Sequence, residues 1–309
     1  MNTSKIILQS GEYKLLLQSF TEWLALLGYS PLSIPCLSKA IRDFFYYQEA
    51  TGKLSLAQLT ASDANGFIEL LQAKEIYSNG HINKQIQALK LFSRYVRETG
   101  KSAVGFSLQR LEEKRNKPVW LTKQEMQLLY EAIPDTVLGI RDKAMLAIYY
   151  GCGLRLNEGA GIELNDIDST KKVLHVRKGK HYKERFVPIA EKNFEEITLY
   201  LDYARPQLLQ VGAESGNPDS KAYRENKSTA FFIDANKGHP MQKQSLYVRI
   251  KKLVKKAGIK KKVGTHTLRH SIATHLLQSG MKLERIQQFL GHADLDSTQI
   301  YTHLVNETL

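Results

Sequence analysis

Cysteine is nearly absent from this chain of 309 residues, which contains only Cys36 and Cys152. Two cysteines so far apart in the sequence indicate neither a disulfide framework nor a four-cysteine zinc site. Long apolar runs are also missing, so no segment is expected to cross a membrane. The first 17 residues lack the basic start and the uninterrupted apolar stretch of a signal peptide. We therefore expect a protein of the reducing cytoplasm that has no membrane partner.

Acidic residues are in deficit relative to basic ones. The chain has 44 Lys and Arg against 31 Asp and Glu, which gives a formal net charge of +13. An excess this large favours a polyanionic partner, with nucleic acid first, and the alternative is a basic surface that only maintains solubility. No cluster of Asp and Glu stands out, so the sequence does not favour a metal-dependent nuclease.

The chain length and the hydrophobic pattern predict two domains. In the first hundred residues, apolar side chains recur at helical spacing in four segments, 15–27, 38–52, 62–71 and 79–100. This pattern predicts a bundle of four or so helices in a domain of residues 1–104. Residues 105–118 break the pattern with Gly105, a charged stretch and Pro118, and we interpret them as a linker. The second domain is then residues 119–309.

The second domain is expected to be mostly helical with a small antiparallel β-sheet, so the fold class is mainly α. It begins with a capping box formed by Thr122 and Glu125. Helices are predicted at 141–150 and from about residue 156, and strands at 173–176 and 185–189, with residues 179–183 at the tip of the hairpin. Residues 212–227 are polar and predict a mobile insertion.

A basic amphipathic helix is predicted near residue 250. Ile250, Leu253, Val254 and Ala257 lie at i, i+3, i+4 and i+7, and basic residues, beginning with Arg249, fill the other faces. A solvated charged face would explain this pattern, but few acidic residues lie nearby, so we expect a surface that binds DNA phosphates. The residues expected to bind them are Lys251, Lys252, Lys255, Lys256, Lys260 and Lys261.

Four short motifs carry the strongest signal. Around residue 155 the chain reads GCGLRLNEGAGI, the hairpin reads RKGKHYKERFVPI, and two later segments read HTLRHSIATHLL and LGHADLDSTQIYTHL. In this order they resemble the catalytic domain of the tyrosine recombinases of the phage integrase family, and the Xer-like group most closely. The helical first domain is similar to the core-binding domain of that family. Each motif alone is weak evidence, but four in order leave little room for chance.

The resemblance implies a site-specific recombinase that cleaves and rejoins duplex DNA without a metal or another cofactor. Tyr301 would attack the phosphorus, leaving a 3′-phosphotyrosine and a free 5′-hydroxyl, so that rejoining needs no ATP. Arg155 and Arg269 would hold the non-bridging oxygens, because guanidinium groups bind two phosphate oxygens at once. His266 would assist proton transfer at the tyrosine or bind the phosphate, and His292 would hydrogen-bond the same phosphate.

Two further residues complete the implied site. Lys180 would protonate the departing 5′-oxygen, because an alkoxide is a poor leaving group. An ungapped match to the family hairpin favours Lys180, although the family often has glycine where His181 stands, and Lys178 and Lys183 compete for the role. Glu158 lies one helical turn after Arg155 and would hold neighbouring groups in place.

Other interpretations of the same residues remain open. His266 and His270 have the i, i+4 spacing of metal ligands, but Thr267 follows His266, so the H-E-x-x-H zinc motif is absent. His270, His275 and His303 are expected to be packing or supporting residues. Gly159 and Gly161 depart from the family pattern and would weaken the helix that carries Arg155 by about 1 kcal/mol each.

The resemblance implies that two domains clamp duplex DNA with short inverted half-sites, and that four protomers assemble on two such sites. An accessory or partner recombinase is a further possibility. Only eight residues follow Tyr301, so we expect weak self-association without DNA. A separate arm-binding domain is not expected. The sequence leaves open chromosome-dimer resolution against mobile-element integration, excision or inversion, a topoisomerase with the same chemistry, and an inactive DNA-binding protein.

Overall fold

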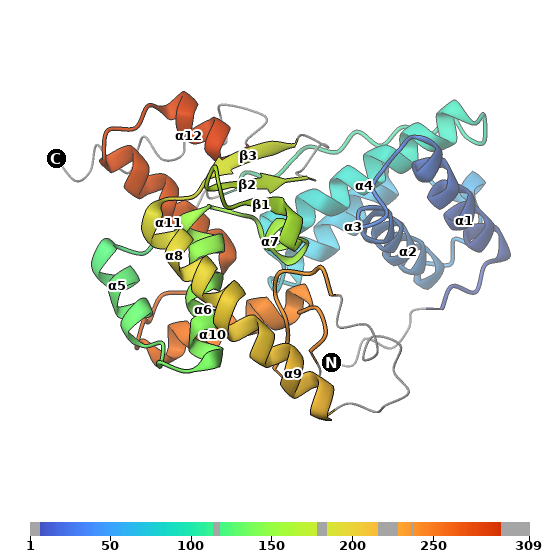
Figure 1. The fold of residues 1–309 in the computed structure, drawn as a ribbon. Helices are drawn as coiled ribbons and strands as arrows, with labels where there is room; N and C mark the ends of the chain where they lie inside the picture. Colours follow the sequence, from blue (N-terminus) through green and yellow to red (C-terminus); the bar gives the residue numbers. More distant parts are fainter. Residues whose placement is uncertain (1–6, 114–117, 178–183, 216–227, 236–237, 292–309) are drawn as a thin grey trace. The chain divides into compact units, whose positions relative to one another are not determined.

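The structure is a computed structural model that describes residues 7–113, 118–177, 184–215, 228–235 and 238–291. The chain divides into two compact units, Met1–Asn116 and Lys117–Leu309, which are coloured along the sequence in Figure 1. This division falls inside the segment 105–118 that we expected to be a linker. Within the described ranges, no helix is both long enough and apolar enough to span a bilayer.

The described part of the first unit is a bundle of α-helices, as the periodicity predicts. Its helices are α1 (Gly11–Leu26), α2 (Ile34–Ala50), α3 (Ala61–Ala73) and α4 (Asn79–Glu98), with a short 3-10 turn η1 (Leu56–Gln58). Gly28 follows α1 with a φ of 75°, the left-handed conformation in which glycine is favoured. Helix α3 begins one residue earlier than expected, because Thr60 and Asp63 form its capping box.

Part of the expected linker packs on this bundle. Phe106 and Leu108 are buried in the same hydrophobic core as α1–α4. The Ser93 hydroxyl on α4 donates to the carbonyl of Val104 (3.1 Å) and accepts from the amide of Phe106 (3.0 Å). The segment beyond residue 104 therefore belongs in part to the first unit, because its apolar side chains complete that core.

The second unit consists of helices packed around a small sheet. Its first elements are α5 (Lys123–Glu131), α6 (Val137–Leu146), the π-helical turn η2 (Ala147–Gly151), α7 (Leu156–Ala160) and the 3-10 turn η3 (Leu164–Asp166). The strands are β1 (Ile167–Asp168), β2 (Val173–Val176) and β3 (Arg185–Pro188). The later helical elements are α8 (Glu191–Leu199), η5 (Tyr200–Ala204), α9 (Arg205–Ser215), α10 (Lys243–Lys256), α11 (Thr265–Gln278) and α12 (Leu283–Leu290).

The sheet is antiparallel with the order β1-β2-β3. Leu174 faces Val187 in the register and both are fully buried, which fixes the inner face of the hairpin. Helix α6 packs against α8 and α10, and strand β3 packs against α12 (Figure 1). The two strands predicted at 173–176 and 185–189 are confirmed within a residue, whereas the hairpin tip at 179–183 lies outside the described residues.

Two other boundaries differ from the expectation. Helix α9 continues to Ser215, so it includes the first residues of the segment 212–227 that we expected to be an insertion, and residues 216–227 lie outside the described residues. Helix α10 ends at Lys256, and Gly258 beyond it has a φ of 70°. Lys260 and Lys261 therefore lie in the loop that follows the basic helix.

Arg249 on α10 does not belong to the basic exterior where the periodicity places it. Its guanidinium binds the carboxylate of Asp142, which is fully buried on α6, with Nε 2.9 Å from Oδ1 and 2.8 Å from Oδ2. A buried carboxylate requires such a partner, because an unpaired charge is costly to remove from water. Arg249 thus ties α10 to the core, and the lysines on the remaining faces are left exposed.

The two glycines near Arg155 play different structural parts. A Cβ atom on Gly159 would lie 2.5 Å from the ring of Tyr149 on η2, so glycine permits the close approach of α7 and η2. Gly161 follows the last residue of α7, and a Cβ atom there would meet the carbonyls of Asn157 at 3.5 Å and Glu158 at 3.8 Å, which are ordinary van der Waals contacts. The expectation that both glycines weaken the helix therefore fails at Gly161, which lies beyond its end.

We predict that Gly159→Ala lowers the free energy of unfolding by about 1–3 kcal/mol, because the methyl group would displace the ring of Tyr149. Gly161→Ala serves as the matched control and should change it by less than about 1 kcal/mol. Urea denaturation followed by circular dichroism measures both. Equal stability of the two variants would contradict this account of α7.

Candidate functional site

Arg155 is positioned by a tight turn at the end of η2. Gly153 has a φ of 62°, and a Cβ atom there would lie 2.9 Å from the side chain of Leu290. Both the backbone conformation and the close contact therefore favour glycine at this position. Arg155 then caps the N-terminus of α7, and its amide donates to the carboxylate of Glu158 (2.9 Å). The first turn of α7 therefore fixes Arg155 and Glu158 together.

The Glu158 carboxylate is surrounded by three guanidinium groups, and its side chain is only 3% exposed. Arg155 binds Oε1 at 2.7 Å, and Arg185 binds both oxygens, at 3.2 and 2.9 Å. Arg269 lies 3.9 Å from Oε2. Three positive charges against one negative charge leave a net charge of +2, which suits an anionic ligand such as a phosphate.

The pKa of Glu158 responds to this environment. Burial alone would raise it, but the hydrogen bonds and charge of Arg185 and the bonds from Arg155 outweigh burial and lower the pKa to about 2. The carboxylate therefore stays ionised at every pH at which the protein is expected to work. Its charge is a fixed part of the site.

The same arginines also bind the C-terminal end of α12. Arg185 donates to the carbonyl of Phe289 (3.2 Å), Arg269 to that of Leu290 (2.6 Å), and Arg155 to that of Gly291 (3.3 Å). The last carbonyls of a helix receive no hydrogen bond from within the helix, and they form its negative end. The arginines supply those partners and hold α12 beside α7 and β3.

Arg269 and His266 come from the first turns of α11. Arg269 is 3% exposed and donates to the carbonyl of Gly153 at 2.6 Å, which fastens α11 to the turn before Arg155. His266 lies one turn earlier, and its side chain is accessible to solvent. Desolvation, together with the charges of Arg269 and Arg155, lowers its pKa. The imidazole is therefore neutral near pH 7 and can accept a proton.

The structure thus brings together Arg155, Glu158, His266 and Arg269 of the expected site. These four residues come from two of the four motifs, GCGLRLNEGAGI and HTLRHSIATHLL. The other expected catalytic residues lie outside the described residues, and they are Lys180, His292 and Tyr301. Lys178, the alternative to Lys180, lies outside them as well.

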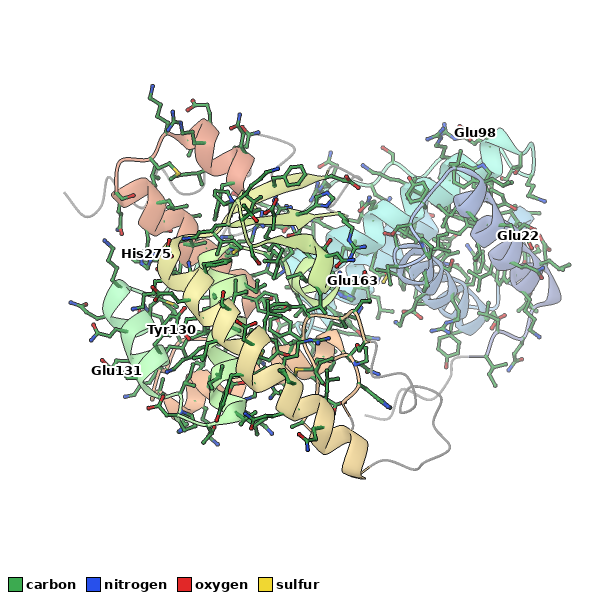
Figure 2. The ribbon with its side chains drawn as sticks, in the orientation of Figure 1. Glu22, Glu98, Tyr130, Glu131, Glu163 and His275 are labelled. Carbon is green, nitrogen blue, oxygen red and sulfur yellow. The ribbon has the colours of Figure 1, made fainter. Side chains whose placement is uncertain are left out.

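The supporting histidines bear on the alternative of a metal site. Burial and the neighbouring His266 and Arg269 lower the pKa of His270 to about 4. His275 is buried, its Nδ1 lies 2.8 Å from the hydroxyl of Tyr150, and it packs at an angle against Trp120 (Figure 2). Among the described residues, no three His, Cys, Asp or Glu side chains are grouped as metal ligands would be.

Sequence reasoning missed Arg185, which contacts Glu158 and α12 in the described site. The motif that we quoted includes this residue, but nothing in the pattern of the strand distinguishes a buried arginine from an exposed one. Only the fold brings Glu158 close to Arg185.

A cavity of about 620 Å³ joins the basic helix to His266. Lys251 and Lys255 of the predicted DNA-binding set line it, and Lys251 lies 4.8 Å from the centre of the Tyr247 ring. Lys261 also lines it, and its ammonium group binds the carboxylate of Glu125 at 2.6 Å. Lys252, Lys256 and Lys260 are exposed.

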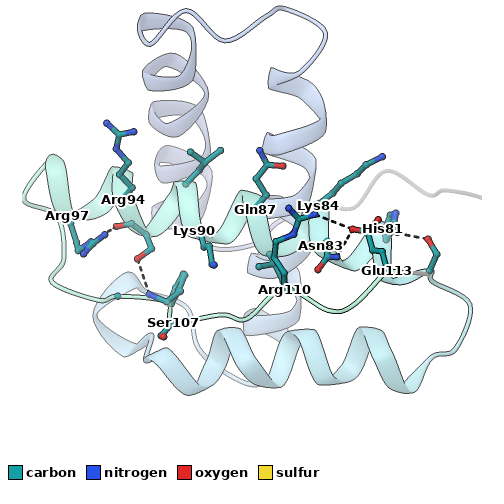
Figure 3. A pocket seen from close by; sticks show the side chains of 17 residues that line it. His81, Asn83, Lys84, Gln87, Lys90, Arg94, Arg97, Ser107, Arg110 and Glu113 are labelled. Carbon is teal, nitrogen blue, oxygen red and sulfur yellow. Dashed lines mark hydrogen bonds and ion pairs between the residues drawn. The ribbon is translucent and has the colours of Figure 1, made fainter. Parts of the chain in front are cut away.

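The first unit has a basic groove that the sequence analysis did not find. The groove has a volume of about 1410 Å³ and lies between α4 and the segment 105–113 (Figure 3). Basic and polar side chains line it, among them Lys84, Gln87, Lys90, Arg94, Arg97, Ser107 and Arg110. Arg94 pairs with Glu98 and Arg110 with Glu113. The periodicity of α4 revealed its buried face, and the groove borders that face, because buried Asn83, Ile86 and Ser93 line it together with the basic side chains.

Comparison with known proteins gives concordant matches. The model of the phage integrase family matches residues 119–308. Tyrosine recombinase XerC of Oceanobacillus iheyensis is 31% identical over 305 residues, which cover 97% of this chain and 94% of that protein. Tyrosine recombinase XerD of Proteus mirabilis is 35% identical over 266 residues, which cover 84% and 79% of the two chains.

Two solved structures share the fold. The XerH site-specific recombinase, in a post-cleavage complex with a palindromic difH substrate, matches with a TM-score of 0.72 and 20% identity over 97% of this chain and 83% of that chain. A lambda integrase tetramer bound to a Holliday junction matches with a TM-score of 0.67 and 13% identity over 94% and 78%. The mostly helical architecture expected from the sequence is confirmed.

We predict that Glu158→Gln lowers the free energy of unfolding by about 3 kcal/mol at pH 7, because three guanidinium groups lose a buried counterion. The folded pKa of about 2 lies below that of an unfolded glutamate. The stability from this carboxylate is therefore complete above the unfolded pKa and is lost as the pH falls toward about 2. Roughly half of the difference between parent and variant should disappear by about pH 3.

Urea denaturation at several pH values measures this difference. Glu131→Gln, at an exposed glutamate of α5 (Figure 2), is the matched control and should follow the parent at every pH. A difference for Glu158→Gln that is independent of pH would contradict a depressed pKa.

Proposed function

This chain belongs to the phage integrase family and is a tyrosine-type site-specific DNA recombinase, and from this premise we propose which of its residues perform the reaction. Arg155 and Arg269 bind the non-bridging oxygens of the scissile phosphate, and Tyr301 attacks its phosphorus. The observation that carries this proposal is that Arg155 and Arg269 both reach one buried carboxylate, that of Glu158, while His266 lies one helical turn before Arg269 on α11.

The charge of the site suits the transition state. The Tyr301 oxygen forms a bond to phosphorus while the bond to the 5′-oxygen breaks, and negative charge increases on the non-bridging oxygens between these events. Arg155 and Arg269 are held before DNA arrives by Glu158 and by backbone carbonyls. Donors that are already oriented stabilise developing charge without a reorganisation cost.

Two proton transfers accompany the exchange of bonds. His266, neutral because its pKa is lowered, receives the proton of the Tyr301 hydroxyl or hydrogen-bonds the phosphate. Lys180, or Lys178 if the hairpin match is displaced by two residues, gives a proton to the departing 5′-oxygen. His292 follows Gly291 directly in the sequence, and it hydrogen-bonds the same phosphate.

Two basic surfaces bind the DNA backbone in this proposal. In the second unit, Lys251 and Lys255 share a cavity with His266, so a duplex whose scissile phosphate is at the site would have neighbouring phosphates beside α10. In the first unit, the groove along α4 presents Lys90 and Arg97 at helical spacing. The division 1–104, 105–118 and 119–309 remains our proposal for the functional domains.

The partner is duplex DNA with short inverted half-sites, on which four protomers assemble at two sites in the cytoplasm. A partner recombinase remains part of the proposal. The Xer relatives favour resolution of chromosome dimers, and the alternative is integration, excision or inversion of a mobile element. Sequencing the DNA that flanks the gene would separate these roles.

We predict that Tyr301→Phe retains DNA binding and forms no covalent adduct, because only the nucleophilic oxygen is lost. Target duplexes are first selected from a randomised library by covalent capture on the parent protein. Denaturing gels of nicked suicide substrates then measure the adduct. Tyr203→Phe, at an exposed tyrosine of η5, is the control and should react like the parent. An undiminished adduct with Tyr301→Phe would refute the assignment.

We predict that both basic surfaces contribute to the salt dependence of DNA affinity. Each lost phosphate contact should reduce the slope of log K against log salt by about 0.9. Lys251→Gln with Lys255→Gln, and separately Lys90→Gln with Arg97→Gln, should each flatten the slope in fluorescence anisotropy titrations. Lys14→Gln with Lys171→Gln, at exposed lysines elsewhere, should not. An unchanged slope for either test pair would assign that surface to solvent.

A further inference from the structure

Arg185 occupies a central place in the site although the reaction scheme gives it no part. It is the first residue of β3, and its side chain is 10% exposed. Its guanidinium binds both oxygens of Glu158 at 3.2 and 2.9 Å and donates to the carbonyl of Phe289 at 3.2 Å. One side chain thus connects strand β3, the first turn of α7 and the end of α12.

The chain is shaped to receive this side chain. Gly291 has a φ of 65°, and a Cβ atom there would lie 2.8 Å from Cδ of Arg185 and 3.0 Å from its Nη1. Any other residue at 291 would meet the stem and the guanidinium of the arginine. Because the side chain of Arg185 is only 10% exposed, we do not expect it to contact the DNA directly.

The contacts of Glu158 show what Arg185 changes. Without Arg185, the buried carboxylate would have only Arg155 at 2.7 Å and Arg269 at 3.9 Å to balance its charge. A buried carboxylate attracts the nearest cation strongly. It would then compete with the scissile phosphate for the two groups that the phosphate needs.

We propose that Arg185 is a positioning residue of the recombination site. It binds the Glu158 carboxylate, so that Arg155 and Arg269 stay oriented toward the scissile phosphate and the carboxylate does not offset their charge. The inference rests on the proposed roles of Arg155 and Arg269. It makes Arg185 necessary for the rate of cleavage and of little importance for DNA affinity.

Arg185→Met tests this role in single-turnover cleavage of a suicide substrate at saturating protein. The rate should fall about tenfold to a hundredfold, the range for residues that orient the groups of a site. The Kd for the same duplex, measured by anisotropy, should stay within about threefold, because Arg185 is buried. Arg177→Met is the matched control. It removes an arginine of the same hairpin that binds Glu163 and Asp166, and it should cleave at the parent rate.

A second substitution separates an electrostatic role from support of the fold. Adding Glu158→Gln to Arg185→Met removes the carboxylate that competes with the phosphate, and cleavage should recover about tenfold, a coupling typical of residues in contact. Thermal melting of each variant is measured in parallel. If Arg185 only supported the fold, the double variant would cleave no faster than the single one.

Two results would overturn the inference: parental cleavage by Arg185→Met, or no recovery in the double variant. If Arg185→Met does not fold, Arg185→Lys and the double variant carry the same comparison, with the lysine expected to cleave faster than the double variant and slower than the parent. Failure of the proposed function would appear separately, as an adduct formed by Tyr301→Phe while Arg185 is intact.

Discussion

The burial of a single carboxylate, that of Glu158, constrains the whole site, because a charge removed from water is stable only among close and well-oriented partners. The partners come from α7, β3 and α11, and none is near all the others in sequence. Each element must therefore reach its final place before the charge is balanced. The arrangement of the three guanidinium groups is therefore coupled to the packing of α7, β3 and α11.

The carbonyls at the end of α12 also need partners, and the same arginines provide them. A group that is held by both a carboxylate and a carbonyl has few orientations left. This explains how long and flexible arginine side chains can form a site that is ready for a phosphate without rearrangement.

Local patterns in the sequence were sufficient for much of the fold. The helical periodicity predicted the bundle of the first unit, and the capping box at Thr122 and Glu125 is present with hydrogen bonds in both directions. The strands followed from two short, mainly apolar runs on either side of a hairpin tip, and the order of four motifs was sufficient to indicate the family. These signals depend on residues a few positions apart, which is why sequence alone could reveal them.

Contacts between distant segments could not be predicted in this way. Arg249 belongs to a helix whose pattern indicates a basic exterior, yet its partner Asp142 lies 107 residues earlier. Lys261 follows the same basic run and pairs with Glu125, 136 residues away. Arg185 is the third case, because its guanidinium pairs with Glu158, 27 residues earlier. Whether a charged side chain is exposed or paired depends on its neighbours in space, and the fold determines those neighbours.

Three successive carbonyls, those of Phe289, Leu290 and Gly291, are bound by three different arginines. Moving this end of α12 would take an acceptor from all three arginines at once. The residues that follow in the sequence include the proposed nucleophile. The position of this helix end and the orientation of Arg155, Arg185 and Arg269 therefore depend on each other.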